Sequence, residues 1–299
     1  MRKIFWFFVN LPPSIRSKIS YIASLIPGIK QFRQKHIDKF YGGGADYSLI
    51  SFPKSGRTWL RMLIGRLLNY HYSLNVKKRD SLDLNSLRIL DERVPKFLLT
   101  HDRVPRKTPS ELAESIDKFE GKKVIFVVRD PRDVVVSHFF ERTKRSSTHS
   151  YDQPISKFIR EDVGGFRTII EYYNTWIHNK DVPSAFLLVR YEDLQTQPVK
   201  ELHRVATFLD LKDVKEDDLK QAVDDSTFNK MRSLEMKQAV KSDCLLPVDV
   251  KDFSSYKTRE GKVGGYKKHL SEQDVRWLNQ VMEEHLEVDL GYRPFAKQN

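Results

Sequence analysis

Four short runs of continuous apolar residues, set between longer helical patterns, limit the folds open to this chain of 299 residues. The runs lie at residues 47–52, 96–100, 124–128 and 185–189. Because they are continuous and not alternating, they predict strands buried on both faces of a parallel sheet.

The clearest helical pattern, with apolar residues at spacings of three and four, covers residues 57–70. Helices are also expected at residues 130–144, 166–178, 199–209 and 271–285. Strands that alternate with helices predict an α/β fold, P-loop-like and three-layered, in which helices flank a central, mostly parallel sheet. The aperiodic stretch 232–262 predicts a long loop able to act as a lid.

The positive charge is concentrated near the N-terminus. The chain carries a net charge of +12, and residues 1–40 hold eight lysines or arginines against one acidic residue. We therefore expect a basic, partly apolar arm at residues 1–44 and one domain at residues 45–299. Two interpretations of the arm stay open: residues 1–40 lie on an anionic membrane surface, or they pack on the domain or lack a fixed fold.

Other features of the sequence indicate the cellular compartment of the protein and its partners. The apolar run at residues 4–9 is too short to cross a bilayer, and no small-residue cleavage site follows it, so neither a transmembrane helix nor secretion is expected. A single cysteine and the absence of zinc-ligand spacing favour a reducing, cytoplasmic compartment and no metal site. Since the charge is mild outside the arm, no nucleic-acid partner is expected.

The first predicted strand ends in PKSGRT at residues 53–58 and leads directly into the first predicted helix. Such a loop places successive backbone N–H groups at a helix N-terminus, which favours an anion. Lys54 adds a charge able to reach a phosphate or sulfuryl oxygen, and Ser55 and Thr58 add hydroxyl donors. The lysine precedes the glycine, unlike in the P-loop order G-K-[ST]. The alternative interpretation is an ordinary strand-to-helix turn.

The third predicted strand repeats this arrangement. It is followed by Arg129 and by a predicted helix with Asp133 in its first turn and Ser137 about two turns in. An arginine at the carboxyl end of a strand can hold a phosphate through two parallel hydrogen bonds. An ion pair among the neighbouring charges is the alternative role for Arg129.

These two segments resemble the 5'-phosphosulfate and 3'-phosphate motifs of the sulfotransferases that use 3'-phosphoadenosine 5'-phosphosulfate (PAPS). A third segment, REGKVGGYK at residues 259–267, is similar to the family signature R-K-G-x-x-G-D-W-K. The resemblance covers nearly all of residues 45–270. It implies a cytosolic-type sulfotransferase that moves a sulfuryl group from PAPS to a hydroxyl acceptor, releases adenosine 3',5'-bisphosphate (PAP) and needs no metal.

The resemblance also implies the site residues. The 5'-phosphosulfate and the adenine face would be held by Lys54, Ser55, Gly56, Arg57, Thr58 and Trp59. The 3'-phosphate would be held by Arg129, Ser137, Arg259 and Gly261. Further nucleotide contacts would come from Tyr191, Ser226 and Phe228. For Trp59, Tyr191 and Phe228, packing in the core is the alternative. Lys54 and Ser137 also count among the implied catalytic residues.

The expected catalytic base is His101, which follows the second predicted strand and matches the histidine of the family's K-T-H segment. Its ordinary pKa near 6.5 suits removal of a hydroxyl proton at neutral pH. Asp102 is the alternative base. The acceptor stays open between a small molecule, a lipid and a glycan, because acceptor pockets are built from variable loops.

Several positions depart from the family pattern. Arg57 stands where threonine is common and Leu99 where a lysine often precedes the Thr-His pair, which suggests redistributed charge around the sulfuryl group. Glu260, Gly265 and Tyr266 replace a lysine, an aspartate and a tryptophan. Two other functions remain to be separated from sulfuryl transfer: a P-loop kinase-like phosphotransferase, and a non-catalytic protein that binds membrane or nucleotide.

Overall fold

The computed structural model describes residues 44–77, 80–102, 107–112, 116–145, 151–237, 245 and 247–292. The chain divides into two units, Met1–Ala45 and Asp46–Asn299, and everything below concerns the second. The predicted arm up to residue 43, and with it the predicted membrane contact, lies outside the described residues. Within the described ranges, no helix is both long and apolar enough to span a membrane.

Four parallel strands form the sheet at the centre of the fold, in the order β2-β1-β3-β4. They are β1 (Tyr47–Ser51), β2 (Phe97–Thr100), β3 (Lys123–Val128) and β4 (Ala185–Arg190). Ile50 of β1 pairs with Thr100 on one side and with Phe126 on the other. The predicted α/β fold with a parallel sheet is confirmed.

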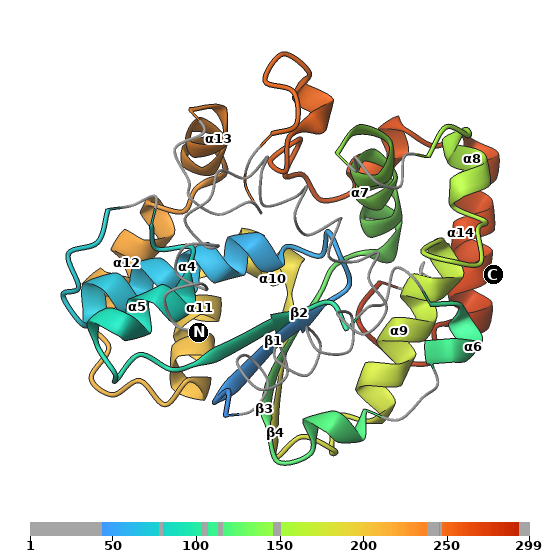
Figure 1. Cartoon of the computed structure of the whole chain (residues 1–299). Helices are drawn as coiled ribbons and strands as arrows, with labels where there is room; N and C mark the ends of the chain where they lie inside the picture. The colour runs from blue at the N-terminus through green and yellow to red at the C-terminus, as the bar shows by residue number, and fades with distance from the viewer. Residues whose placement is uncertain are drawn as a thin grey trace, which may run out of the picture. The chain divides into compact units, whose positions relative to one another are not determined.

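Helices cover both faces of this sheet (Figure 1). One layer contains α4 (Arg57–His71), α5 (Leu84–Leu90), α11 (Pro198–Phe208) and α12 (Glu216–Asp224). The other contains α6 (Pro109–Leu112), α7 (Pro131–Lys144), α8 (Ile155–Phe158), α9 (Phe166–His178) and α14 (Glu272–His285). Alternate side chains of β3 enter the two layers, Ile125 and Val127 the first, Val124 and Phe126 the second.

All four strands end at the same edge of the sheet because they are parallel. The PKSGRT loop follows β1, His101 follows β2 and Arg129 follows β3. β4 runs directly into the short helix α10 (Tyr191–Thr196). This edge is where α/β folds bind their ligands, and it collects residues from every predicted motif.

The predicted loop at residues 232–262 is wrong at its start, because helix α13 (Phe228–Met236) continues to Met236. The inner face of α13 contains Met231 and the fully buried Glu235. Because Glu235 is polar but faces inward, it interrupts the apolar spacing from which helices were predicted, and α13 was not recognised. Farther along, a 3-10 turn, η5 (Phe253–Ser255), interrupts the stretch.

Glu235 also fixes the segment that follows. Its carboxylate accepts hydrogen bonds from the backbone N–H groups of Lys257 (2.6 Å) and Thr258 (2.9 Å) and from the Thr258 hydroxyl (2.7 Å). Arg145 lies 3.3 Å from the same group. A buried carboxylate with these partners holds the approach to Arg259 at a defined place against α13.

Candidate active site

The loop after β1 is shaped to present its backbone. Lys54 and Gly56 both have left-handed backbone angles, with φ of 75° and 97°, and Gly56 is the N-cap of α4. No described side chain caps this helix, and its first turn has no acidic residue. A Cβ on Gly56 would lie 2.5 Å from Cδ2 of Tyr191, so only glycine lets the loop pass beneath that ring. The result is an uncapped, positive helix end.

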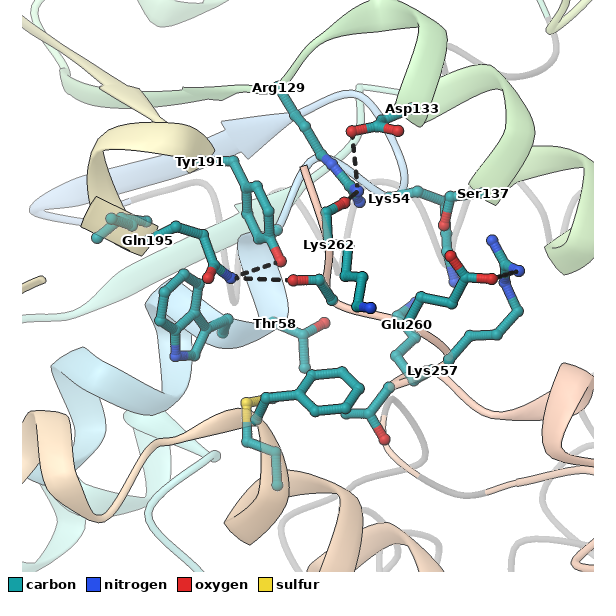
Figure 2. A pocket seen from close by; sticks show the side chains of 18 of the residues that line it. Lys54, Thr58, Arg129, Asp133, Ser137, Tyr191, Gln195, Lys257, Glu260 and Lys262 are labelled. Atoms are coloured by element: carbon teal, nitrogen blue, oxygen red, sulfur yellow. Dashed lines mark hydrogen bonds and ion pairs between the residues drawn. The ribbon is translucent and has the colours of Figure 1, made fainter. Parts of the chain in front are cut away.

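A cavity of about 470 Å³ opens at this helix end. Figure 2 shows side chains from the β1 loop, α7, α10 and the segment after Glu235 converging on it. Most residues implied by the resemblance line it: Lys54, Gly56, Arg57, Thr58, Trp59, His101, Arg129, Ser137, Tyr191, Phe228, Arg259 and Gly261. Ser55 and Ser226 do not line it, and both are fully buried.

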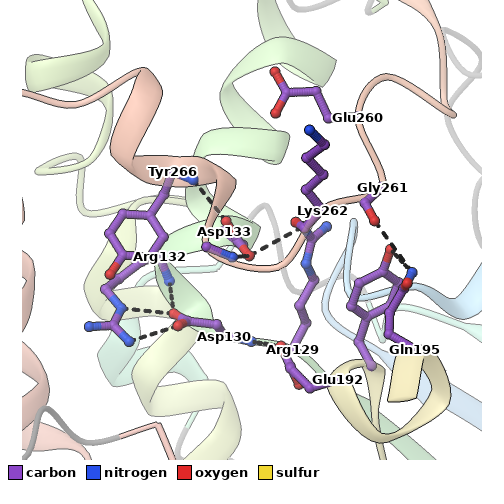
Figure 3. A network of polar contacts seen from close by, with 12 residues as sticks. Arg129, Asp130, Arg132, Asp133, Glu192, Gln195, Glu260, Gly261, Lys262 and Tyr266 are labelled. Carbon is purple, nitrogen blue, oxygen red and sulfur yellow. Dashed lines mark hydrogen bonds and ion pairs between the residues drawn. The ribbon is translucent and has the colours of Figure 1, made fainter. Parts of the chain in front are cut away.

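Arg129 and Asp133 join two walls of the cavity (Figure 3). Nη2 of Arg129 donates to the carbonyl of Lys262 (2.8 Å) and lies 3.3 Å from Oδ2 of Asp133. The Asp133 carboxylate accepts from the N–H groups of Gly264 (2.8 Å) and Tyr266 (2.9 Å). Arg129 therefore forms an ion pair with Asp133, and its side chain still lines the cavity. Asp133 ties the 259–267 segment to α7.

The 259–267 segment brings a second arginine and a close glycine contact. Nη1 of Arg259 donates to Oε1 of Glu260 (2.9 Å) and lies 3.0 Å from Nε2 of His269, while the guanidinium covers the ring of Phe140 at 4.0 Å. Gly261 has φ of 64°, and a Cβ there would collide with the ring of Phe228. Glu260, where the resemblance expects lysine, thus partners Arg259.

Two polar atoms in this region are buried without a hydrogen-bond partner among the described residues, and one of them belongs to a residue that lines the cavity. They are Nε of Arg129, at the cavity, and Oγ of Ser226. The aromatic wall next to them contains Trp59, whose Nε1 donates to the Ser226 carbonyl (2.8 Å) and whose ring lies 5.6 Å from that of Tyr191. Arg129 also stacks on Tyr191, with its guanidinium carbon 4.5 Å from the ring centre. The arginine donor and the aromatic faces at the cavity are groups that suit a phosphorylated purine.

Positive charge is concentrated around the Lys54 ammonium. Nζ of Lys54 lies 2.7 Å from Oε2 of Glu141, and Nζ of Lys257 lies 3.8 Å from Oε1 of the same carboxylate. Burial and then the charge of Lys257 lower the pKa of Lys54, against the attraction of Glu141. Burial raises the pKa of Glu141, but the charges of Lys54, Lys257 and Arg145 outweigh it and hold that pKa well below its ordinary value. An anion entering the cavity would meet both lysine side chains, of which Lys54 is already removed from solvent by burial.

His101 is held from both sides of its ring. Its Nδ1 lies 2.8 Å from the carbonyl oxygen of Ser51, and its Nε2 lies 2.8 Å from Nη2 of Arg57. Burial, followed by the charge of Arg57, lowers the pKa of His101 well below its ordinary value. The imidazole is therefore neutral at physiological pH, as a base must be. Asp102, the alternative base, pairs with Lys118 and is not among the described residues that line the cavity.

Comparison with known proteins identifies the family of this fold and site. The family model described as "Sulfotransferase domain" matches residues 45–288. The chain belongs to the sulfotransferase family. Cytosolic sulfotransferase 12 of Arabidopsis thaliana is 26% identical over 266 residues, which cover 82% of this chain and 78% of that protein. Sulfotransferase 1B1 of Mus musculus is 26% identical over 253 residues, which cover 79% of this chain and 81% of that protein.

Solved structures agree on the fold of this sulfotransferase. Mouse sulfotransferase SULT7A1 complexed with PAP has a TM-score of 0.59 at 21% identity, covering 86% of this chain and 92% of that one. Retinol dehydratase in complex with androsterone and inactive cofactor PAP has a TM-score of 0.58 at 16% identity, covering 82% of this chain and 81% of that one. The order of the elements is therefore shared well beyond the motifs.

Some residues at the sulfotransferase cavity were not anticipated from the sequence. Lys257 and Gln195 line the cavity. Glu141 contacts Lys257 and also Lys54. Glu141 lies one helical turn after Ser137 on α7, a spacing that could have indicated it. No motif indicates Lys257. Across the described ranges, no three His, Cys, Asp or Glu side chains are grouped as a metal site would need.

Proposed function

We propose that this protein transfers a sulfuryl group from PAPS to a hydroxyl acceptor, with His101 as the base. The observation that carries the proposal is the meeting of Lys54, Arg129 and Arg259 with His101 around one cavity. These cations come from three distant parts of the chain and suit a ligand with two separate anionic groups. PAPS has such groups and supplies an already activated sulfuryl group.

The donor would be bound in two halves. The N–H groups of the β1 loop, Lys54, Arg57 and Thr58 are assigned to the phosphosulfate, with Ser55 supporting the loop from inside the fold. The 3'-phosphate is assigned to Arg129, Ser137, Arg259 and Gly261, so that the guanidinium of Arg259 would exchange Glu260 for the phosphate. The adenine is assigned to the wall formed by Trp59, Tyr191 and Phe228, with the buried Ser226 supporting Trp59 through its carbonyl.

The residues then divide the chemistry between proton transfer and charge stabilisation. Nε2 of His101 would take the acceptor's hydroxyl proton as the new oxygen–sulfur bond forms. Lys54 and the helix N-terminus would stabilise the charge that develops on the leaving phosphate oxygen, and Ser137 would add a hydroxyl donor. These groups are preorganised, which is the main requirement for catalysis of an in-line displacement.

The acceptor is assigned by chemical class only. A hydroxyl on a small molecule is favoured, because the retinol dehydratase structures carry androsterone and retinol. Lipid and glycan hydroxyls remain part of the proposal. We further propose a cytoplasmic location, in line with the names of the Arabidopsis relatives called cytosolic sulfotransferases. Peripheral membrane contact through residues 1–40 is a separate prediction.

Thermal unfolding with two nucleotides separates this function from a kinase-like phosphotransferase. PAP without magnesium is expected to stabilise the protein by about 2.7 kcal/mol at a concentration of about 100 times its Kd. ATP with magnesium should stabilise it much less. A larger effect of ATP with magnesium, and none of PAP, would contradict the proposal.

PAP binding without turnover would point instead to a non-catalytic nucleotide-binding protein. The matching measurement is transfer from PAPS to a broad panel of hydroxyl compounds.

A further inference from the structure

The hydrogen bonds of His101 define its protonation. The guanidinium of Arg57 carries only donors and stays protonated, so across the 2.8 Å contact Nη2 donates and Nε2 of His101 accepts. The carbonyl of Ser51 can only accept, so Nδ1–H donates to it across 2.8 Å. The ring is therefore neutral, with its proton on Nδ1 and its lone pair on Nε2.

That lone pair is the one the proposed base requires. A ring nitrogen has one lone pair, so Nε2 cannot hold the Arg57 donor and receive a hydroxyl proton at the same time. Arg57 stands where the family pattern commonly has threonine, which is too short to make a matching guanidinium contact. Nε2 of His101 is therefore blocked by Arg57, a residue that this chain does not share with the family pattern.

Arg57 also lies where a bound anion would reach it. It is the first residue of α4, next to Gly56, and lines the same cavity as Lys54 and Thr58. Phosphate and sulfuryl oxygens are stronger acceptors for a guanidinium than a neutral imidazole, because the hydrogen bond to them is charge-assisted. An anion at the helix end that draws the guanidinium toward itself would therefore compete with His101 for Nη2 of Arg57.

We propose that Arg57 holds Nε2 of His101 in the free protein and that a phosphosulfate bound at the β1 loop takes this guanidinium over. The base then becomes available only after the donor has bound, which makes the donor the first substrate in the order of binding. This role of Arg57 as a positioning residue rests on the proposed function of the site.

The competition has a measurable consequence for nucleotide affinity. If binding must break the Arg57–His101 hydrogen bond, removal of the imidazole should tighten PAP binding. His101→Ala is expected to bind PAP about threefold to tenfold more tightly than the wild type in calorimetry. Arg57→Thr should bind PAP about tenfold more weakly, because a charge-assisted contact is lost. The double variant should match Arg57→Thr, with no gain from the second change.

His101→Leu repeats the test with a side chain that fills the space but has no lone pair, in case the alanine variant fails to fold. His178→Ala, at an exposed histidine outside the cavity, is the matched control and should leave the Kd unchanged. A merely structural role of Arg57 predicts no tighter binding in either His101 variant. That result, or a gain that persists without Arg57, would overturn the inference. If the wild type itself does not bind PAP, the proposed donor is wrong and the inference falls with it.

Discussion

Arg129 illustrates how one side chain can serve the fold and the ligand together. Its guanidinium contacts Asp133 and the Lys262 carbonyl, stacks on Tyr191, and still keeps Nε without a partner among the described residues. A buried, unpaired donor is costly in a protein that binds nothing. The arrangement makes sense if a phosphate oxygen completes it.

We therefore predict that Arg129→Ala weakens PAP binding by about tenfold to a hundredfold, the effect of losing a charge-assisted contact of about 1.5–3 kcal/mol. Calorimetry with PAP measures it directly. Arg276→Ala is the control, because that arginine is 71% exposed and pairs only on the surface of α14. Equal affinities of the two variants would remove the 3'-phosphate assignment.

At the scale of elements, the 259–267 segment is positioned by two buried carboxylates. Glu235 of α13 holds its approach, and Asp133 of α7 holds its glycine turn. These two carboxylates therefore help to keep Arg259 and Gly261 at the cavity, together with the 3-10 turn η6 (Gly265–Lys268). The two left-handed glycines of the 259–267 segment, Gly261 and Gly264, provide a matched pair for an experiment.

An alanine at either glycine is expected to cost about 1–2 kcal/mol of stability, because both have positive φ. Only Gly261→Ala should also weaken PAP binding, since its methyl group would displace the ring of Phe228, whereas nothing lies within 4 Å of a Cβ at Gly264. Urea unfolding and calorimetry separate the two effects. Loss of PAP affinity in both variants alike would contradict the assigned role of Phe228.

The sequence predicts the sheet and the long helices well because burial on both faces leaves clear apolar runs. The strand limits differ from the predicted ones by two residues or fewer. The shorter helices α5, α6, α8, α10, α12 and α13 were not predicted; α10, for example, has only six residues, and α13 buries a carboxylate. Motifs indicated most of the residues named at the cavity, but not Lys257 or the adjoining Glu141, because their pairing depends on how distant segments pack.

At the scale of the whole molecule, the layer that contains α7 and α9 encloses a histidine outside the site. His138 is buried, its Nδ1 lies 3.0 Å from the Gly164 carbonyl, and burial lowers its pKa to about 4. An unfolded histidine binds a proton below about pH 6.5. Between pH 6.5 and 4 the unfolded state therefore holds more protons, and the free energy of unfolding falls as the pH is lowered. His101 acts in the same direction.

We predict that acidification through this range lowers stability with a slope of up to about 1.4 kcal/mol per pH unit from His138 alone. Urea unfolding at pH values between about 7.5 and 4.5 measures the slope. His138→Asn should reduce it, while His203→Asn, at an exposed histidine, should not. An unchanged slope in the His138 variant would show that other groups cause the loss.

The central claim, sulfuryl transfer with His101 as the base, is tested most directly by transfer of label from sulfur-labelled PAPS to a hydroxyl panel. The wild type should give a labelled product. His101→Ala should lose about 100-fold to 10,000-fold in rate while binding PAP at least as tightly as the wild type. Asp102→Asn should keep most of its turnover, because that carboxylate pairs with Lys118 away from the cavity. A histidine variant that keeps its turnover, beside an asparagine variant that loses it, would contradict the account and assign the base to Asp102.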